Sequence, residues 1–393
     1  MNTDGIATSI RVHPCSSVAN LSMADAVLVQ PDTSFIKDVM ASGGGDLKKC
    51  FQCGTCTAVC ALAADDQTFP RRQMIAAQWG QKDRLVADPA IWLCYDCGDC
   101  TAQCPRGARP SDVCGAIRRV AIKHFAFPAF LGSLVANPKA LPLLFLLPAL
   151  IFLAIAFWAP RGAATPEAEF ANVFPIPVLE ALFFAVSGFV LLAFVVGIAR
   201  LAKALRAGGG GGLVAAALVA AVVEIATHRR FAECGAERQR RLGHLLTLYG
   251  FLGLAMMGTV VGVGTMLGVM RTPLALTNPL KLVANACAAV ILAGVLLLLA
   301  ERLVDPAKRA ASTYFDWFFL VVLAGVVITG IVSEVLRLAQ ATVVMYAVYF
   351  IHLVLIFALF LYAPYSKFAH LAYRTVAMAI AGSRFKVPGS KLF

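Results

Sequence analysis

Two short stretches of the 393-residue chain decide its fold: residues 50–60 read CFQCGTCTAVC, and residues 94–105 read CYDCGDCTAQCP. Both stretches carry four cysteines with the spacing C-x2-C-x2-C-x3-C, and the second ends in Cys-Pro. Thiolates at this spacing ligate iron–sulfur clusters, and the fourth cysteine of each run reaches the other cluster. The spacing therefore predicts two [4Fe–4S] clusters, with the ligand sets Cys50, Cys53, Cys56 and Cys104, and Cys94, Cys97, Cys100 and Cys60.

A pair of zinc sites or a set of disulfides is the alternative interpretation of these runs. Zinc takes four ligands, commonly from two separated C-x2-C pairs, so two complete runs exceed what it needs. Ten of the 12 cysteines precede residue 115, and the first 20 residues contain no apolar stretch typical of a signal peptide. We therefore expect a reducing cytoplasm, where clustered cysteines hold metal more often than they form disulfides.

The composition indicates membrane spans. Hydrophobic residues make up 60% of the chain and charged residues 14%, which excludes a disordered or single soluble globular protein. A bilayer crossing takes about 20 apolar residues. Six apolar runs are long enough, namely 141–158, 177–199, 245–270, 279–300, 315–336 and 343–364. A shorter apolar run, residues 213–227, contains Glu224 and is expected to be an interfacial or docking helix.

These features predict an all-α protein, in which a helical ferredoxin domain is followed by a six-helix transmembrane domain, and the histidines and the resemblance described below indicate that the latter is a haem-b domain. An amphipathic helix expected over Arg71–Trp79, between the cysteine runs, is typical of helical ferredoxins. The expected parts are an N-terminal arm over 1–34, a cytoplasmic two-cluster domain over 35–138, a membrane domain over 139–375 and a cytoplasmic tail over 376–393.

The distribution of charge predicts the orientation. Residues 1–138 hold 13 Lys and Arg against 12 Asp and Glu, whereas residues 139–393 hold 21 against 10. With the cysteine-rich part inside, the inner loops carry 16 Lys and Arg and the outer loops carry 4. This positive-inside pattern favours the cytoplasmic membrane with both termini in the cytoplasm. Because the basic excess lies in short loops between apolar runs, we expect no nucleic-acid partner.

Four histidines lie in or beside the apolar runs, and ionisable residues there are candidates for function. His352 is inside the last run, and His370 follows 18 residues later. If one helix continued through both, they would lie on the same side, separated by ~27 Å of rise. Such a pair suits two haems stacked across a bilayer. His244 is a further candidate ligand at the inner haem, and His228 is either a ligand or a contact to the cysteine-rich domain.

The cysteine runs resemble the iron–sulfur subunit of heterodisulfide reductases. The segment from His352 to His370, including Tyr365-Ser366-Lys367, resembles the last haem-binding helix of the nitrate reductase gamma subunit family. The two modules in this order resemble the C subunit of the quinone-interacting membrane-bound oxidoreductase complex. This resemblance implies two cubane clusters, one or two haem b groups, menaquinone, and flavin and iron–sulfur partner subunits. It also implies indirect service to adenylylsulfate reductase in dissimilatory sulfur metabolism.

The resemblance also marks two further residues. In the nitrate reductase relatives another haem-binding helix carries two histidines, and aligning it on Thr272-Pro273 places Met256 and Met266 there instead. Methionine ligates haem iron in some cytochromes, so Met266 is a candidate ligand, with gap-filling in an apolar helix as its alternative role. The same alignment puts Lys281 at the position of a quinone-contacting lysine. Its alternative role is that of a snorkelling interfacial residue.

Three functions remain open on this sequence. The first is a membrane electron-transfer subunit that uses menaquinone and belongs to an oxidoreductase complex. The second is the haem-bearing membrane anchor of a heterodisulfide reductase-like or sulfite-reduction-linked complex. The third is a transporter or structural anchor that carries a ferredoxin domain and no haem. Quinol/quinone interconversion is the one bond chemistry we expect of the chain, and no nucleophilic catalytic residue is expected.

Overall fold

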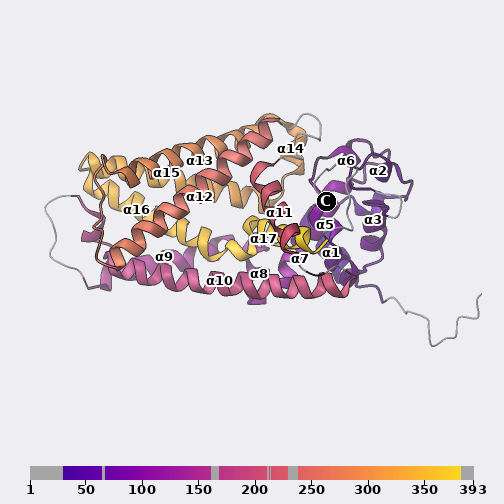
Figure 1. Ribbon diagram of the computed structural model, residues 1–393, viewed down its shortest axis with the longest axis horizontal. Coiled ribbons are helices and arrows are strands. Elements are labelled where there is room, and N and C mark those ends of the chain that lie inside the picture. The colour runs from indigo at the N-terminus through magenta and orange to yellow at the C-terminus, as the bar shows by residue number, and fades with distance from the viewer. Residues whose placement is uncertain are drawn as a thin grey trace, which may run out of the picture.

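The computed structural model describes residues 30–63, 67–160, 168–209, 212, 214–228 and 238–381. Within these ranges the chain is helical and contains no strand. The molecule is elongated, with long helices running along its main axis and a cap of short helices at one end (Figure 1). The predicted all-α fold class is confirmed.

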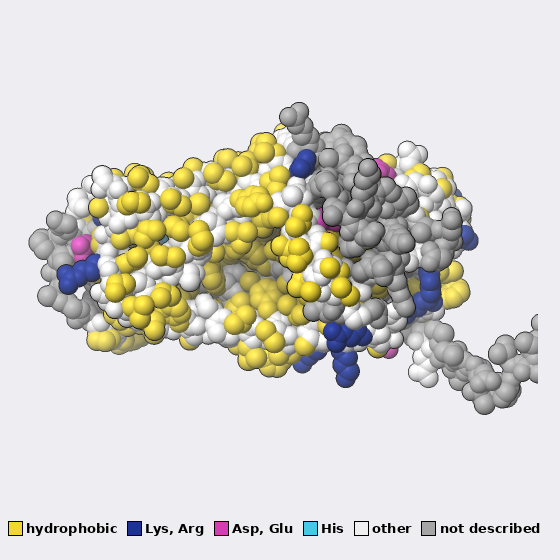
Figure 2. Space-filling model, viewed as in Figure 1, with side chains coloured by type: hydrophobic (Ala, Val, Ile, Leu, Met, Phe, Trp, Pro, Cys, Tyr) yellow, Lys and Arg dark blue, Asp and Glu magenta, His cyan; other side chains and the backbone are white. Residues whose placement is uncertain are grey.

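Six of the described helices are long and apolar enough to cross a membrane. They are α9 (Leu141–Trp158), α10 (Ile176–Ala207), α12 (Arg238–Met266), α13 (Pro279–Val304), α15 (Tyr314–Leu338) and α16 (Thr342–Leu361). Apolar side chains cover the visible face of this bundle, and the visible Lys and Arg side chains lie near its ends (Figure 2). An apolar outer surface of this length matches the hydrocarbon layer of a bilayer, and the prediction of six spans is confirmed.

The cap contains the cysteine runs and is built from short helices around a buried one, α7 (Pro110–Phe125). Pro110 starts α7, where a missing N–H costs nothing, and Lys123 and His124 lie in the last turn, where cations suit the helix dipole. Around it lie α1 (Thr33–Val39), a π-helical turn (Met40–Gly44), a 3-10 turn (Leu47–Lys49), α2 (Thr55–Ala58), α3 (Arg71–Gln78), α4 (Lys82–Val86), α5 (Ala90–Leu93), α6 (Asp99–Ala102) and α8 (Ala129–Val135). Helix α3 corresponds to the helix expected between the cysteine runs.

The remaining elements connect the long helices to one another and to the cap. They are the 3-10 turns Pro138–Ala140, Phe170–Asn172 and Ala363–Tyr365, the short helix α14 (Pro306–Ala311), and the helices α11 (Ala215–Thr227) and α17 (Lys367–Ala381). Helix α11 corresponds to the short apolar run of the sequence, and it packs against α17. Helix α17 in turn contacts α10 of the bundle and α5 of the cap.

One hydrophobic core runs from the cap into the bundle. Trp92 and Ile117 of the cap pack in the same cluster as Leu201 of α10 and Tyr373 of α17. Trp92, Ile117 and Leu201 are fully buried, and burying each such side chain contributes roughly 1.5–3 kcal/mol. The cap is therefore held against the bundle by shared apolar burial.

Two boundaries differ from the sequence-based expectation. Helix α1 begins at Thr33, so the last residues of the expected 1–34 arm already form structure, while residues 1–29 lie outside the described part of the chain. Helix α17 continues to Ala381 and buries Ala377 to Ala381, past the expected start of the tail at residue 376. The tail was expected there because the apolar run ends earlier, but α17 is buried by the cap.

Helices α12 and α13 cross closely because small residues line their contact. A methyl group built on Gly250 would lie 2.7 Å from the backbone nitrogen of Ile291, and one on Gly294 would lie 2.6 Å from that of Thr247. Gly258 on the same α12 has nothing within 4 Å of the equivalent position. Small residues at such crossings let helix backbones approach in membrane proteins.

We predict opposite effects for two alanine substitutions on α12. Gly250→Ala should destabilise the protein by about 1–3 kcal/mol, because its Cβ meets backbone that cannot yield without moving α13. Gly258→Ala, the matched control, should be neutral or stabilising by up to about 1 kcal/mol through helix propensity. Thermal unfolding in detergent measures both, and equal Tm values for the two variants would contradict the close crossing.

Candidate redox site

The two cysteine runs share one backbone conformation. Gln52 and Asp96 have φ of 61° and 58°, and Gly54 and Gly98 have φ of 87° and 86°. After each glycine a four-residue helix begins, α2 in the first run and α6 in the second. Left-handed backbone costs glycine little, and it turns each run tightly enough to direct its cysteines inward. The chain therefore builds the same ligand loop twice.

Backbone N–H groups point at the cysteine sulfurs. The amide of Asp96 donates to Cys94 Sγ at 3.4 Å, and the amide of Ala108 donates to Cys104 Sγ at 3.4 Å. A hydrogen bond from the Thr55 side chain lowers the pKa of the exposed Cys53 thiol. Such hydrogen bonds stabilise thiolates, and they tune the potential of a cluster that the thiolates hold.

The cysteines fall into crossed neighbourhoods. Cys50 and Cys104, from different runs, pack against one hydrophobic cluster, whereas Cys60 and Cys94 pack in another. Burial raises the pKa of the Cys100 thiol, and the neighbouring Cys94 and Cys60 sulfurs raise it further. Each neighbourhood thus contains the fourth cysteine of the other run, which is the grouping that the spacing predicts.

The thiols are not gathered around a single ion. Among the described residues, no group of three or more His, Cys, Asp or Glu side chains is arranged to hold one metal ion. A zinc site would require four such ligands at about 2.0–2.3 Å from one centre. The N–H donors at Cys94 and Cys104 and the packing of Cys60 beside Cys94 suit thiolate ligands of iron–sulfur clusters, so the residues present fit the predicted groups.

Cys114 has a contact that the sequence did not reveal. It is fully buried on α7, and its thiol is hydrogen-bonded to Cys94. This hydrogen bond lowers the pKa of Cys94 to about 6. The sequence offered no signal for this role, because Cys114 lies outside both runs and its partner is brought near it only by the packing of α7.

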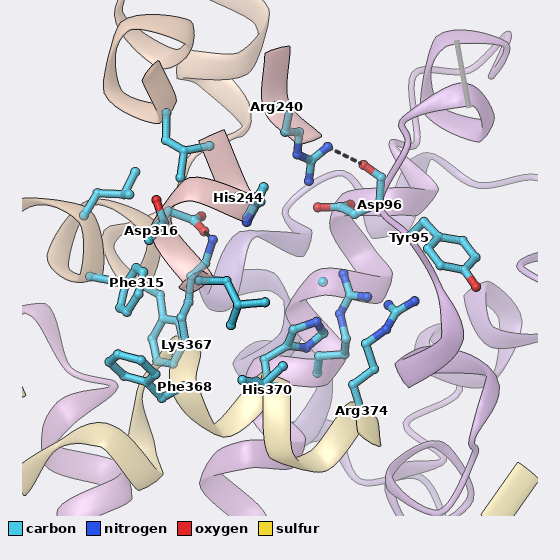
Figure 3. A pocket seen from close by; sticks show the side chains of 18 of the residues that line it. Tyr95, Asp96, Arg240, His244, Phe315, Asp316, Lys367, Phe368, His370 and Arg374 are labelled. Carbon is cyan, nitrogen blue, oxygen red and sulfur yellow. Dashed lines mark hydrogen bonds and ion pairs between the residues drawn. The ribbon is translucent and has the colours of Figure 1, made fainter. Parts of the chain in front are cut away.

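A cavity of about 380 Å³ lies where the cap meets the bundle. His244 of α12, His370 of α17 and His228 at the end of α11 line it. Figure 3 shows His244 and His370 reaching into this space from opposite sides. The rings of His228 and His244 stack with 6.0 Å between centroids. The structure thus brings three of the four candidate histidines together, although they come from three separate helices.

The lining of the cavity is apolar on one side and charged on the other. Its apolar residues are Leu248, Phe251, Leu252, Phe315, Phe319, Leu320, Leu323, Phe368 and Leu371. Burial lowers the pKa of His370 well below its ordinary value, which leaves the imidazole neutral, and burial also lowers the pKa of His228. Neutral imidazole is the form that ligates metal. The two facing imidazoles and an apolar wall with a charged rim fit a haem, whose macrocycle is apolar and whose edge carries carboxylates.

The cavity directly adjoins the second cysteine run. Cys94 itself lines the cavity. The carbonyl oxygen of Cys94 accepts hydrogen bonds from Arg118 of α7 at 2.8 Å and from Arg374 of α17 at 2.9 Å. Arg374 lies one turn after His370, on the same face of α17. A cluster ligand and a candidate haem ligand are therefore joined through one short stretch of structure.

His352 lies apart from this cavity, and the assumption of one continuous helix was wrong. The chain leaves the helical path at Tyr362, makes a 3-10 turn over Ala363–Tyr365, and restarts as α17. Pro364 lacks a backbone N–H, so it breaks the helix. His352 Nδ1 lies 3.0 Å from the Val326 carbonyl and 3.1 Å from Thr329 Oγ1 on α15.

Two further predicted residues lie at the opposite end of the bundle. Met266 ends α12 with its side chain 66% exposed, and no described contact places it beside His352. Lys281 at the start of α13 forms an ion pair with Glu334 of α15 at 3.1 Å, and Arg337 contacts the same carboxylate at 3.0 Å. The Lys281 side chain is therefore part of a charge cluster, rather than a lone snorkelling residue.

Comparisons with known proteins agree with the cysteine pattern. A family model described as a 4Fe-4S dicluster domain matches residues 46–108. The chain is 38% identical over 107 residues to the C subunit of the H(2):CoB-CoM heterodisulfide,ferredoxin reductase of Methanothermobacter thermautotrophicus, which covers 26% of this chain and 58% of that relative. It is 33% identical over 119 residues to a protein of Archaeoglobus profundus that is named as similar to the C subunit of heterodisulfide reductase, which covers 30% of this chain and 61% of that relative.

The chain thus spans about three-fifths of the length of the curated relatives it matches. No solved structure matches it. Its N-terminal part carries a [4Fe–4S] ferredoxin domain like that of the heterodisulfide reductase C subunit. The chain is accordingly an iron–sulfur protein related to the C subunit of heterodisulfide reductase, with six helices of membrane-spanning length.

Proposed function

We propose that the chain is a membrane electron-transfer subunit that passes electrons between the menaquinone pool and cytoplasmic flavin and iron–sulfur partner subunits. The observation that carries this proposal is the cavity where His244 and His370 meet the Cys94 loop. A site for a membrane redox group then adjoins a cluster site of the cap. The resemblance of the sequence to the quinone-interacting oxidoreductase family supports adenylylsulfate reductase as the eventual partner, and the positive-inside pattern supports a cytoplasmic cap.

The eight cysteines of the two runs hold two [4Fe–4S] clusters in this proposal. Cys60 completes the set of Cys94, Cys97 and Cys100, and Cys104 completes the set of Cys50, Cys53 and Cys56. The crossed packing of Cys60 beside Cys94 supports this assignment. When bound, the clusters and the haem supply one-electron transfer. The chain holds them, excludes water from them and directs N–H donors at their sulfur ligands.

His244 and His370 are the proposed axial ligands of a haem b at the cavity. Both line the cavity, and they come from two helices, α12 of the bundle and α17, which packs against the cap. His228 stacks on His244, so we assign it to the same site as a residue that orients the His244 ring. The side of the cavity formed by Phe315, Phe319 and its apolar neighbours provides the dry wall for the macrocycle.

His352 is the proposed ligand of a second haem. With its proton on Nδ1, His352 donates to the Val326 carbonyl, which leaves Nε2 free to bind metal in the manner of an oriented ligand. Met266 is not brought to it in the described part of the chain, so the other axial ligand is unassigned. The chain therefore has a paired haem site at the cavity and a single candidate ligand deeper in the bundle.

Lys281 and Glu334 form the proposed quinone site. Oxidation of a quinol releases two protons with its two electrons, so the site needs a proton acceptor. Glu334 would accept one proton from a quinol hydroxyl, and the second proton would leave to the solvent that reaches this partly exposed pair, while Lys281 Nζ would donate a hydrogen bond to the quinone oxygen. Their mutual ion pair keeps both groups charged until a head group displaces it.

A second candidate function is a haem-bearing anchor of a heterodisulfide reductase-like or sulfite-reduction-linked complex. It is favoured by the heterodisulfide reductase names of the relatives. The same sites would then serve a different membrane carrier and different partners. The subunits that copurify with the chain distinguish the two candidates: two flavoproteins support the first, and a heterodisulfide- or sulfite-reducing enzyme supports the second.

Crossed ligation predicts for which pairs of cysteine substitutions the losses of non-haem iron add up. Cys60→Ala should remove about four of about eight non-haem irons per chain. Combining it with Cys97→Ala should remove no more, because both residues serve one cluster. Combining it with Cys53→Ala should remove both clusters. Iron analysis and electron paramagnetic resonance measure this, and the reverse pattern of additivity would establish uncrossed ligation. Cys287→Ala, at a cysteine of α13 outside the runs, is the control that keeps both clusters.

Loss of either axial histidine should remove the haem from the cavity. His370→Ala and His244→Ala should each abolish the absorbance of that haem in a reduced-minus-oxidised spectrum, because a six-coordinate haem loses one ligand. His124→Ala is the control, since His124 packs on Phe125 in α7 and does not line the cavity. An unchanged spectrum in both axial variants would exclude this haem site.

The quinone site predicts that a substitution of Lys281 changes mainly the KM and that a substitution of Glu334 changes mainly kcat. Lys281→Met should raise the KM for a menaquinol analogue about tenfold, because it removes a charged donor to the quinone oxygen. Glu334→Gln should lower kcat about 100-fold or more, because it removes the proton acceptor. Lys203→Met, at an exposed residue of α10, is the control. Wild-type kinetics in both site variants would rule out a quinone site at this end of the bundle.

A further inference from the structure

The junction cavity is lined by more positive than negative side chains. Its six cationic residues are Arg118, Arg119, Arg240, Arg302, Lys367 and Arg374. Its four acidic residues are Asp96, Asp112, Glu224 and Asp316. Six against four leaves an excess of two positive charges. Charges removed from water are costly unless they are compensated, so the excess favours an anionic ligand.

Two of the four acidic residues, Asp316 and Asp112, already have ion-pair partners. Asp316 forms an ion pair with Lys367, and it also accepts hydrogen bonds from Thr313 in the capping box of α15. Asp112 is paired with Arg109 at 2.5 Å, and Arg109 does not line the cavity. Neither carboxylate is paired with Arg118 or Arg374, the two arginines that bond to the Cys94 carbonyl.

Of the cationic residues, Arg118 and Arg374 are the best placed to bind an anionic ligand. Arg118 is 7% exposed, and it donates to the carbonyls of Ile91 and Cys94. Arg374 donates to the carbonyls of Leu93 and Cys94. A guanidinium has five N–H donors in a planar fork, so each arginine keeps donors beyond those two bonds. Figure 3 shows the Arg374 guanidinium reaching into the cavity between His370 and Tyr95.

We propose that Arg118 and Arg374 bind the two carboxylates of the haem that His244 and His370 hold. This inference rests on the proposed function, and it adds the residues that orient the porphyrin and the direction in which its carboxylate edge lies, toward Cys94. Arginine binds carboxylates through paired, charge-assisted hydrogen bonds, which are stronger than neutral ones. Two arginines and two carboxylates also form two matched ion pairs.

The same two arginines thereby couple the two redox sites. Each would hold a haem carboxylate with one part of its guanidinium and the Cys94 carbonyl with another. The hydrogen-bonded path from the porphyrin edge to a cluster ligand is then continuous. A change at either arginine should therefore alter the haem and the Cys94 cluster together.

The test uses full-length protein purified with its bound groups. Arg374→Gln and Arg118→Gln should each release haem to a scavenging apoprotein about tenfold faster than wild type. Each should also shift the reduction equilibrium of that haem about tenfold toward the ferric form, ~59 mV for one electron, because a positive charge that favours the added electron is lost. Arg374→Lys keeps the positive charge but loses the planar guanidinium. It should therefore restore the wild-type reduction potential, whereas haem release should stay as fast as in Arg374→Gln.

The matched control is Arg200→Gln. Arg200 Nη1 donates to the Ala126 carbonyl at 2.8 Å and so ties α10 to the cap in the same manner, but Arg200 does not line the cavity. The proposal would be overturned if Arg118→Gln and Arg374→Gln both showed the same haem release rate and the same reduction potential as Arg200→Gln. Loss of haem in His370→Ala within the same series would leave the proposed function standing. If Arg374→Gln does not fold, Arg374→Lys and Arg118→Gln still decide the outcome.

A free phosphate is the other anion that this chemistry would accept. Thermal unfolding of His370→Ala protein with and without inorganic phosphate distinguishes the two. Under our proposal phosphate gives little protection, because the arginines are spaced for two carboxylates on one rigid edge. Two results together would overturn the proposal in favour of a free-phosphate site. Phosphate would protect His370→Ala protein against unfolding but would not protect the double variant that also carries Arg374→Gln, and the single Arg374→Gln variant would release haem at the wild-type rate.

Discussion

The carbonyl oxygen of Cys94 accepts two hydrogen bonds from buried arginines, and the arrangement of the redox site depends on this contact. Arg118 belongs to the central helix of the cap, and Arg374 belongs to the last described helix, which follows the membrane spans. Hydrogen bonds from charged donors contribute about 1.5–3 kcal/mol each. Because His370 lies one turn before Arg374, fixing Arg374 on the cysteine loop also fixes the imidazole at the wall of the cavity.

Helix α17 can make this connection because it is buried on two sides for different reasons. Ala369, Tyr373 and Ala377 recur every four residues and pack into the core shared by the cap and α10. His370 and Arg374 lie on the neighbouring face and line the cavity. Apolar burial therefore sets the position of the helix, and the polar face presents ligands and donors to the site. Neither the cap nor the bundle alone contains both halves of the cavity.

The sequence predicted what depends on local pattern and missed what depends on packing. The six spans follow from the length of the apolar runs, and the ligand loops follow from cysteine spacing and from Gly54 and Gly98. The break before α17 had a signal in Pro364, but the His352–His370 spacing was interpreted as one helix. The contact of Cys114 with Cys94 had no signal, because residues twenty apart meet only through the packing of α7. The cavity likewise joins His244 and His370 across 126 residues.

The fold also fixes the order of the two cluster sites relative to the membrane. Cys94 lines the junction cavity, whereas Cys53 is exposed and the adjoining Phe51 is 68% exposed, with Arg106 stacked on its ring at 4.3 Å. An exposed aromatic residue beside a ligand loop lies where a partner can approach. The proposed crossed ligation would have a structural consequence. Cys60 and Cys104 would each tie one site to the loop of the other, so the inner and outer sites could not move apart. A chain that must conduct between a bilayer and a partner surface benefits from that rigidity, because transfer depends on a fixed separation.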